Sequence, residues 1–259
     1  MSGSRETVGK TITVAAVLCI ACSILVSAAA VSLRSTQQKN KALDKKKNIL
    51  AAAGLLEEGA DVEAVFAEKV KIKIVNLGKG TYNEDFDPAT FDQRKAAKDP
   101  DTSIKIPSGE DLARIKRRAT VASVYEVYDN GQLKQVVFPV HGKGLWSTMY
   151  GFLALEPDMR TVAGLGFYEH GETPGLGGEI DNPKWKATWV GKKIFDDSDK
   201  MSIDVLKGQT VAGSPKIQYE VDGLSGATLT ANGVEDLVRY WLAEDTFKPY
   251  IEKIRQRGA

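Results

Sequence analysis

Cysteine and histidine are scarce in this 259-residue chain, and their scarcity excludes several kinds of site. The only cysteines are Cys19 and Cys22, both within the apolar N-terminal run, so the sequence offers no disulfide framework. The rest of the chain has no cysteine with which to hold an iron–sulfur cluster. The two histidines, His141 and His170, are accompanied by no clustered third ligand, so we expect no metal site.

An excess of charge of either sign is also missing. The formal net charge is +1, and no stretch after the apolar run combines clustered Lys and Arg with aromatic residues, so we expect no nucleic-acid partner. Hydrophobic residues make up 42% and charged residues 27%, which is typical of a globular protein. The length allows one sizeable domain together with an attachment segment.

One long uncharged run stands near the N-terminus. No charged residue lies between Lys10 and Arg34, and a helix over Thr11 to Leu33 is long enough to cross a hydrocarbon core of about 30 Å. A cleaved signal peptide is the alternative, since Ser27 to Ala30 offers small residues of the right kind. The run is long for a signal core, so we expect a retained, single-pass membrane anchor in contact with lipid.

The charges on either side of the run leave its orientation open. More basic residues follow the run than precede it, which by simple count places the C-terminal part in the cytoplasm. Charges that lead into a large translocated domain have less weight than those on short loops, so the count does not decide.

The rest of the chain predicts an α+β fold, because strand patterns and helix patterns occur in separate stretches. Asp129-Asn130-Gly131 between two alternating segments predicts a β-hairpin. We expect a short tail over 1–10, a transmembrane helix over 11–33, a helical stalk over 34–60 and one α+β domain over 61–259. Strands are expected over 71–75, 121–128, 133–140, 145–154, 162–168 and 216–221, and helices after Asp61, over 110–118, 183–190 and 246–255, and around 234–242.

The strongest local motif is Asp222-Gly223-Leu224-Ser225-Gly226-Ala227-Thr228-Leu229-Thr230, between a predicted strand and a predicted helix. Its small residues allow another molecule to approach the backbone, and Thr228 places a hydroxyl at or just before a helix N-terminus, where free amides favour a phosphate. An ordinary helix cap formed by Thr228 or Thr230 explains the pattern equally well.

Two further motifs have the composition of binding loops. The segment from His170 to Gly178 is rich in Gly and Pro, which indicates a shaped loop or a plain surface turn, and within it Glu172, Thr173, Gly175 and Leu176 are candidates for contact with a ring system. Gly144-Leu145-Trp146-Ser147 supplies Leu145 and Trp146, and the indole is a flat surface on which a ring can stack, although a core tryptophan is the commoner case.

These residues carry a family resemblance. Asp222-x-x-Ser225-Gly226-Ala227-Thr228 resembles the covalent flavinylation motif of bacterial FMN-binding domains. Together with the Glu172–Gly177 loop, the Gly144–Trp146 stretch and the anchor, it is similar to the C-subunit family of the Na⁺-translocating NADH:quinone reductases. The G subunit of the Rnf electron-transport complex shares the first two motifs and is the alternative, but the Gly-Leu-Trp-Ser stretch favours the sodium pump.

The resemblance implies a role and a set of site residues. A flavin transferase would attach FMN from FAD through a phosphoester to Thr228, with Leu224, Ser225, Gly226 and Ala227 around the linkage. Lys207 is a candidate counter-charge for the phosphate. The domain would lie on the periplasmic side of the bacterial inner membrane, in a complex of six different subunits, and pass electrons towards quinone. It would have no catalytic residues of its own.

Two other classes of function fit parts of the sequence. Gly223-Leu224-Ser225-Gly226-Ala227 approaches the nucleophile elbow of serine hydrolases, but Ala227 replaces the final glycine and both histidines precede Ser225, whereas the elbow fold requires its histidine afterwards. A non-redox, membrane-anchored binding module would require the Ser225–Thr228 motif to be a plain helix cap.

Overall fold

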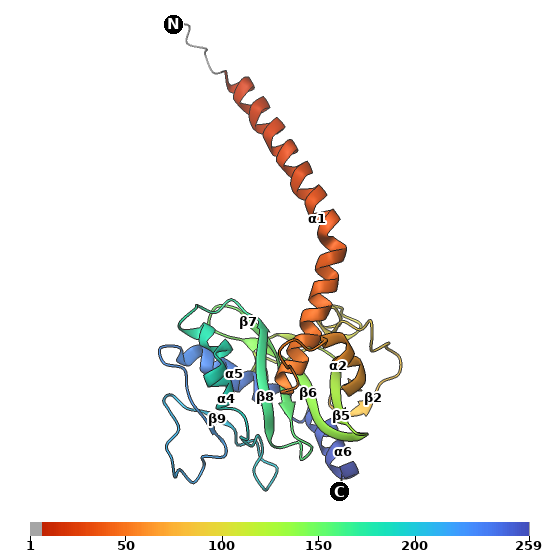
Figure 1. Ribbon diagram of the computed structural model, residues 1–259. Coiled ribbons are helices and arrows are strands. Elements are labelled where there is room, and N and C mark those ends of the chain that lie inside the picture. The colour runs from red at the N-terminus through yellow and green to blue at the C-terminus, as the bar shows by residue number, and fades with distance from the viewer. Residues whose placement is uncertain (1–6, 259) are drawn as a thin grey trace. The chain divides into compact units, whose positions relative to one another are not determined.

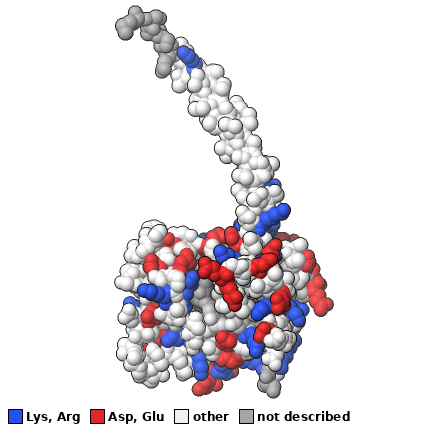
Figure 2. Space-filling model, viewed as in Figure 1, with Lys and Arg blue, Asp and Glu red and all other residues white. Residues whose placement is uncertain are grey.

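The computed structural model describes residues 7–258, and the chain divides into two compact units, 1–44 and 45–259. Helix α1 (Val8–Ala52) is continuous for 45 residues and is long and apolar enough to cross a membrane. Figure 2 shows its uncharged stretch as an uninterrupted white surface. We expected a helical stalk over 34–60, and the helix ends at Ala52, with its last two turns inside the second unit.

The second unit is built on one antiparallel sheet of six strands in the order β2-β1-β5-β6-β7-β8 (Figure 1). These strands are β1 (Val70–Asn76), β2 (Thr81–Tyr82), β5 (Val121–Asp129), β6 (Gln132–Lys143), β7 (Thr148–Leu155) and β8 (Val162–Glu169). Two small sheets pair β3 (Ser103–Lys105) with β4 (Arg117–Ala119), and β9 (Asp204–Val205) with β10 (Glu220–Val221). The helices are α2 (Val62–Lys69), α3 (Gln93–Ala96), α4 (Pro183–Ala187), α5 (Thr228–Trp241) and α6 (Lys248–Gly258), with a 3₁₀ turn, η1, over Gly177–Asp181.

Both faces of the large sheet are covered, and its central strands accordingly carry apolar side chains on both faces. Successive side chains of a strand point to opposite faces. In β6, Val136 and Phe138 join the larger core with α5 and α6, whereas Val137 joins Ile49 and Phe66 from α1 and α2 in a smaller core. Figure 1 shows α5 and α6 in blue on one side of the sheet and α2 in orange on the other. The α+β prediction is confirmed.

A buried carboxylate fixes the last helix to the sheet. Glu126 of β5 is 2% exposed and accepts hydrogen bonds from the hydroxyls of Tyr82 (2.6 Å), Tyr128 (2.9 Å) and Tyr250 (2.7 Å). Burial and the adjacent carboxylate raise the pKa of Tyr250, so its hydroxyl stays a donor. Three donors compensate for the removal of this carboxylate from water.

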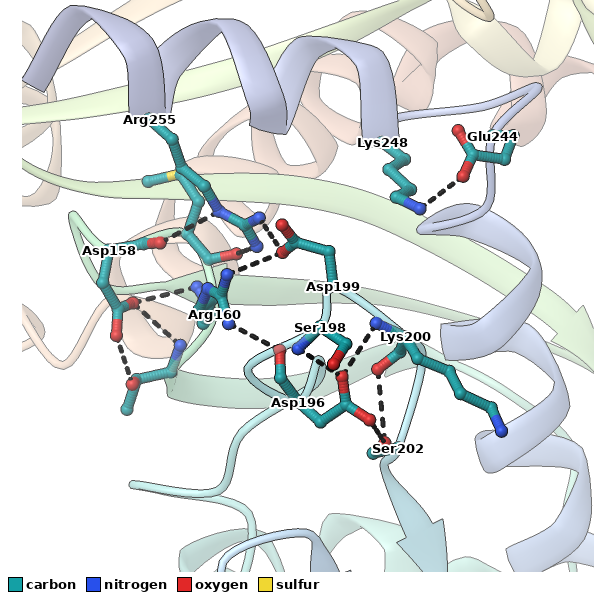
Figure 3. Close-up of polar contacts among 12 residues, drawn as sticks. Asp158, Arg160, Asp196, Ser198, Asp199, Lys200, Ser202, Glu244, Lys248 and Arg255 are labelled. Carbon is teal, nitrogen blue, oxygen red and sulfur yellow. Dashed lines mark hydrogen bonds and ion pairs between the residues drawn. The ribbon is translucent and has the colours of Figure 1, made fainter. Parts of the chain in front are cut away.

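A second polar cluster holds the other end of α6 (Figure 3). Asp199 accepts from Arg255 of α6 at 2.5 Å and from Arg160 at 2.8 Å, and Arg160 also donates to the Asp196 carbonyl at 2.5 Å. Arg255 reaches the Met159 carbonyl at 3.0 Å. These contacts fasten α6 to the β7–β8 turn and to the 196–202 loop.

Most predicted elements are present, and one prediction was wrong. Asn130 and Gly131 have φ of 49° and 78°, as a two-residue hairpin turn requires, and join β5 to β6. The helix predicted over 110–118 is absent: the Asp111 carboxylate accepts the amides of Ile115 (2.9 Å) and Lys116 (2.7 Å) and closes a loop instead. The strand predicted over 216–221 is reduced to Glu220–Val221, since residues 215–219 form turns.

Candidate functional site

The carboxylate of Glu172 joins three segments that the sequence separates widely. Its side chain is 5% exposed and lies between the 144–147 loop, its own 170–178 loop and the first turn of α5. One oxygen accepts from the amides of Trp146 and Ser147, both at 3.0 Å. The other accepts from the amide of Leu145 at 3.2 Å and from the hydroxyl of Thr230 at 2.6 Å. The carboxylate therefore fixes all three segments at one point, and we call this arrangement the Glu172 clasp.

The clasp keeps Glu172 ionised. Burial opposes the charged form, but the hydrogen bonds from Thr230 and from the amides of Ser147, Trp146 and Leu145 outweigh it and lower the pKa of the carboxyl. The sequence predicted Glu172 as a contact for a ring. The structure places its carboxylate against protein donors, which suits a positioning role.

Neighbouring contacts complete the clasp. The Ser147 hydroxyl accepts from the Gly171 amide at 2.7 Å, and His170 lies between Asp181 (Nε2 to Oδ2, 2.8 Å) and the Glu172 amide, which donates to Nδ1 at 3.2 Å. A Cβ on Gly144 would lie 2.6 Å from a Glu172 carboxylate oxygen, so glycine is required for the loop to approach so closely.

Helix α5 begins at Thr228 without a side-chain cap. Ala227 occupies the capping position and makes no side-chain capping hydrogen bond, and the first backbone bond runs from the Ala231 amide to the Ala227 carbonyl at 3.0 Å. The first amides of a helix have no intrahelical acceptor, and they carry the positive end of the helix dipole. Thr228 is exposed at this terminus. An anion bound here would find free donors, and Thr230 does not cap the helix because its hydroxyl bonds to Glu172.

The turn before α5 brings the second loop against the threonine motif. Ser225 and Gly226 form a turn in which Gly226 has φ of +70°, and a Cβ there would lie 3.1 Å from Cδ2 of Leu176. Gly226 is therefore suited both to the left-handed backbone and to the close packing of Leu176.

Large apolar side chains stay exposed beside these polar contacts. Leu145 is 44%, Trp146 66%, Leu176 46% and Leu229 59% exposed, and each belongs to one of the three clasped segments. Several exposed apolar side chains gathered on segments that meet at one point are typical of a ligand-binding surface. An uncapped helix terminus among apolar side chains fits a ligand that has both a phosphate and a flat ring.

Close packing fixes the height of α5 relative to the 144–147 loop. A Cβ on Gly233 would lie 2.6 Å from the Lys143 carbonyl oxygen and 3.3 Å from Cα of Gly144. The indole of Trp241, two turns further on, donates to the His141 carbonyl at 2.7 Å. The helix carrying Thr228 and the loop carrying Trp146 thus form one rigid arrangement.

The remaining predicted site residues lie around this centre with fewer contacts. Leu224 is buried, Thr173 is exposed with its carbonyl accepting the Gly178 amide at 2.8 Å, and Gly175 has φ of +76°. Lys207 is exposed, and its backbone lies beside Gly223, whose amide donates to the Gly208 carbonyl at 2.7 Å. The structure therefore places the Lys207 backbone near the motif, with its side chain exposed.

The two histidine rings make different contacts. His170 uses both ring nitrogens, with Asp181 and the Glu172 amide, and His141 stacks on Tyr150 with 5.3 Å between ring centroids. The His170 ring therefore has no free nitrogen with which to act as a base for Ser225. Within residues 7–258, no group of three potential ligands could hold a metal ion, either.

A family model described as the FMN-binding domain matches residues 144–243, the stretch that contains all three clasped segments. The C subunit of the Na⁺-translocating NADH-quinone reductase from Pseudomonas aeruginosa is 48% identical over 259 residues, covering 99% of each chain. The chain belongs to the C-subunit family of the Na⁺-translocating NADH-quinone reductases. The Vibrio parahaemolyticus member is 46% identical over 262 residues, covering 100% of this chain and 99% of the relative.

Solved structures from this family have the same fold. The crystal structure of NqrC from Shewanella oneidensis superposes with a TM-score of 0.77 at 38% identity, covering 84% of this chain and 99% of that one. The family member from Parabacteroides distasonis gives a TM-score of 0.66 at 30% identity, covering 85% and 96%. Members of this family are subunits of an oxidoreductase complex. The comparisons do not support the alternative that the chain is the G subunit of an Rnf complex.

Sequence reasoning missed some participants in the site. Ser147 and Thr230 take part in the clasp, and Leu229 adds an exposed apolar side chain next to Thr228. Thr230 and Leu229 lie within the motif that begins at Asp222, but only the fold shows that the Thr230 hydroxyl turns towards Glu172.

Proposed function

We propose that this chain carries FMN as a phosphoester on the Thr228 hydroxyl and serves as an electron-carrying subunit of a Na⁺-translocating NADH:quinone reductase. The observation that supports this most directly is the exposed Thr228 at the uncapped start of α5, among the exposed side chains of Leu145, Trp146 and Leu176. The FMN-binding family match over residues 144–243 agrees with it.

Each residue of the site has a task that follows from its position. Thr228 would hold the phosphate, and the first amides of α5 would stabilise the charge that remains on it. Gly226 and Ala227 allow the linkage to approach the backbone, Ser225 and Leu224 shape the turn, and Lys207 would add a counter-charge. Leu145, Trp146 and Leu176 would contact the ring, with Thr173 and Gly175 beside them. Glu172 would position the loops.

Attachment would use FAD and a flavin transferase. The Thr228 oxygen would form the new P–O bond to the FMN phosphorus, the diphosphate P–O bond of FAD would break, and AMP would leave with the displaced proton. Once bound, FMN supplies the electron-transfer chemistry, and the chain supplies position and electrostatics. Because the tether is covalent, a shallow and exposed ring site is sufficient.

We also propose the setting in which the site works. The uncharged part of α1 would be a single membrane span in the bacterial inner membrane, and the 61–259 domain would lie on its periplasmic side. The partners would be the other subunits of an assembly of six, along which electrons pass towards quinone. The family membership and the apolar helix support this arrangement.

The test is the intact mass of the chain produced together with a flavin transferase. Wild-type protein should be heavier than its sequence by FMN less one water, and its flavin fluorescence should survive denaturation. Thr228→Ala should lose both signals. Thr120→Ala, which changes another exposed threonine, should keep them. A Thr228→Ala protein that retained the added mass would refute the assignment, and loss of the mass in Ser225→Ala alone would move the linkage to that residue.

A further inference from the structure

A cavity of about 780 Å³ lies between α3, the loop that precedes β4, and strands β6 and β7. None of its lining residues is a candidate residue of the Thr228 site. The cavity has an unusual concentration of positive charge. Its cationic lining residues, which define what we call the basic pocket, are Arg94, Lys98, Arg114, Lys116, Arg117 and Lys143, with Tyr150, Thr148 and His141 among the remaining lining residues.

Carboxylates neutralise only part of this charge. Arg94 forms a two-pronged ion pair with Glu169 at 2.6 and 2.9 Å, and Arg114 lies 3.8 Å from Asp236. The Asp111 carboxylate also faces the loop, where it accepts backbone amides. Within the described residues the other four cations form no ion pair: Lys98, Lys116, Arg117 and Lys143. The pocket therefore keeps a surplus of positive charge.

The loop that carries two of these cations has a strained backbone. Arg114 and Lys116 have φ of 55° and 65°, a left-handed conformation that is unfavourable for residues with side chains. Asp111 holds this loop closed, and the Ala113 carbonyl accepts the Lys143 amide at 2.8 Å, which ties the loop to β6. Strained residues that the surrounding structure holds in place are commonly found at binding sites.

The wall of the pocket is rigid and aromatic. The guanidinium carbon of Arg94 lies 3.8 Å from the centroid of the Tyr150 ring, and Tyr150 stacks on His141. Burial, and then the charge of Arg94, lower the pKa of His141 to about 4, so the imidazole is neutral near pH 7. The neutral imidazole can therefore donate a hydrogen bond to an anion from one nitrogen, without adding to the repulsion among the cationic side chains of the pocket.

We propose that the basic pocket binds a small multivalent phosphate anion, such as a diphosphate group. Converging lysines and arginines bind multivalent oxyanions better than single carboxylates, and guanidinium groups match the geometry of phosphate oxygens. A cavity of this volume holds a molecule of nucleotide size.

The pocket is connected to the clasped loop through Lys143. Its ammonium group donates to the Trp146 carbonyl at 3.0 Å, and its backbone precedes Gly144. An anion that engages Lys143 would compete with this hydrogen bond and change the surroundings of Trp146. Anion binding in the basic pocket would thus alter the hydrogen bonding of the 144–147 loop.

The test is calorimetric titration of inorganic diphosphate into the full-length chain held in phosphatidylcholine nanodiscs. We expect saturable binding at one site that weakens as sodium chloride rises.

Lys98→Gln and Lys116→Gln should each weaken diphosphate binding about tenfold, since each removes one charged contact. Neither ammonium group forms an ion pair within residues 7–258, so both variants should fold normally. Lys134→Gln, which removes a lysine on β6 outside the pocket, is the matched control.

A second readout separates pocket binding from general attraction to a charged surface. Bound diphosphate should raise the pKa of His141 above its value of about 4, as followed by NMR of the imidazole. Absence of saturable binding, equal affinities in all three variants, or an unchanged His141 pKa at saturation would overturn the proposal. So would binding of hexaglutamate in place of diphosphate, which would indicate an acidic protein segment as the occupant.

A parallel titration identifies the source of the phosphate. Nanodiscs that contain anionic phosphatidylglycerol repel diphosphate in general, so they should weaken its binding by the same factor in wild type and Lys98→Gln if the ligand is a soluble phosphate compound. If the natural ligand is a lipid headgroup, these nanodiscs should weaken diphosphate binding more in wild type than in Lys98→Gln, because the headgroup competes for the intact pocket. Both results support a phosphate site and differ only in where the phosphate comes from.

Discussion

Replacement of Glu172 by glutamine should loosen the clasp while preserving its shape. The carboxylate accepts the amides of Leu145, Trp146 and Ser147 and the hydroxyl of Thr230. Glutamine keeps one acceptor oxygen but places an NH₂ group opposite donors, where it cannot accept. The side chain is 5% exposed, so water cannot easily replace the lost acceptor.

The cost can be worked from the contacts that are lost. The oxygen replaced by NH₂ accepts three hydrogen bonds if it is Oε1 and two if it is Oε2. Removing an acceptor from buried donors costs about 1–3 kcal/mol, more where the acceptor is charged. We therefore expect Glu172→Gln to destabilise the folded domain by about 2–4 kcal/mol. For a domain of this size that corresponds to a fall in Tm of the order of 10 °C.

Thermal unfolding of wild type, Glu172→Gln and Glu58→Gln at several pH values measures this effect. Glu58 is exposed, so its substitution should change stability by less than about 0.5 kcal/mol. The folded pKa of Glu172 lies below its ordinary value of 4.5, so its ionised form stabilises the fold fully above pH 4.5. That contribution is lost as pH falls through the folded pKa, and the difference between wild type and Glu172→Gln should shrink there. A Glu172→Gln protein as stable as Glu58→Gln at pH 7 would refute the clasp.

Three further substitutions test the parts that position the site. Gly233→Ala should destabilise the domain by about 1–3 kcal/mol in chemical denaturation, because its Cβ would lie 2.6 Å from the Lys143 carbonyl oxygen. Gly131→Ala should cost about 1 kcal/mol in the same assay, since φ there is +78° and open space leaves only the backbone strain. Tyr250→Phe should cost about 1–3 kcal/mol, measured by thermal unfolding, because Glu126 loses one of its buried donors; a change below about 0.5 kcal/mol in any of the three would contradict its stated cause.

Local patterns in the sequence predicted the features that depend on local chemistry. Asp129-Asn130-Gly131 predicted the hairpin because a two-residue turn needs positive φ at its central positions, and the structure has it. The helical spacing of apolar residues predicted the helix around 234–242, and α5 buries Val234, Leu237 and Val238 as expected.

The sequence did not predict the features that depend on residues distant along the chain. The failed helix over 110–118 has an acceptable helical composition, but the Asp111 side chain captures the amides of Ile115 and Lys116 and closes a loop. Glu172 was expected to face a ring, and no local signal shows that its donors come from positions 145–147 and 230. The basic pocket could not be predicted either, because its cations come from α3 and the turn after it, from the loop before β4 and the start of β4, and from β6.

The Glu172 clasp has a consequence for how such a site can be altered. It holds Leu145 and Trp146 through their backbone amides, so the loop keeps its position whatever side chains these two residues carry. The side chains that face outward are thereby uncoupled from the scaffold that presents them. Evolution or protein engineering can exchange the indole at position 146 for another surface, and so retune the environment of whatever binds there, without redesigning the fold.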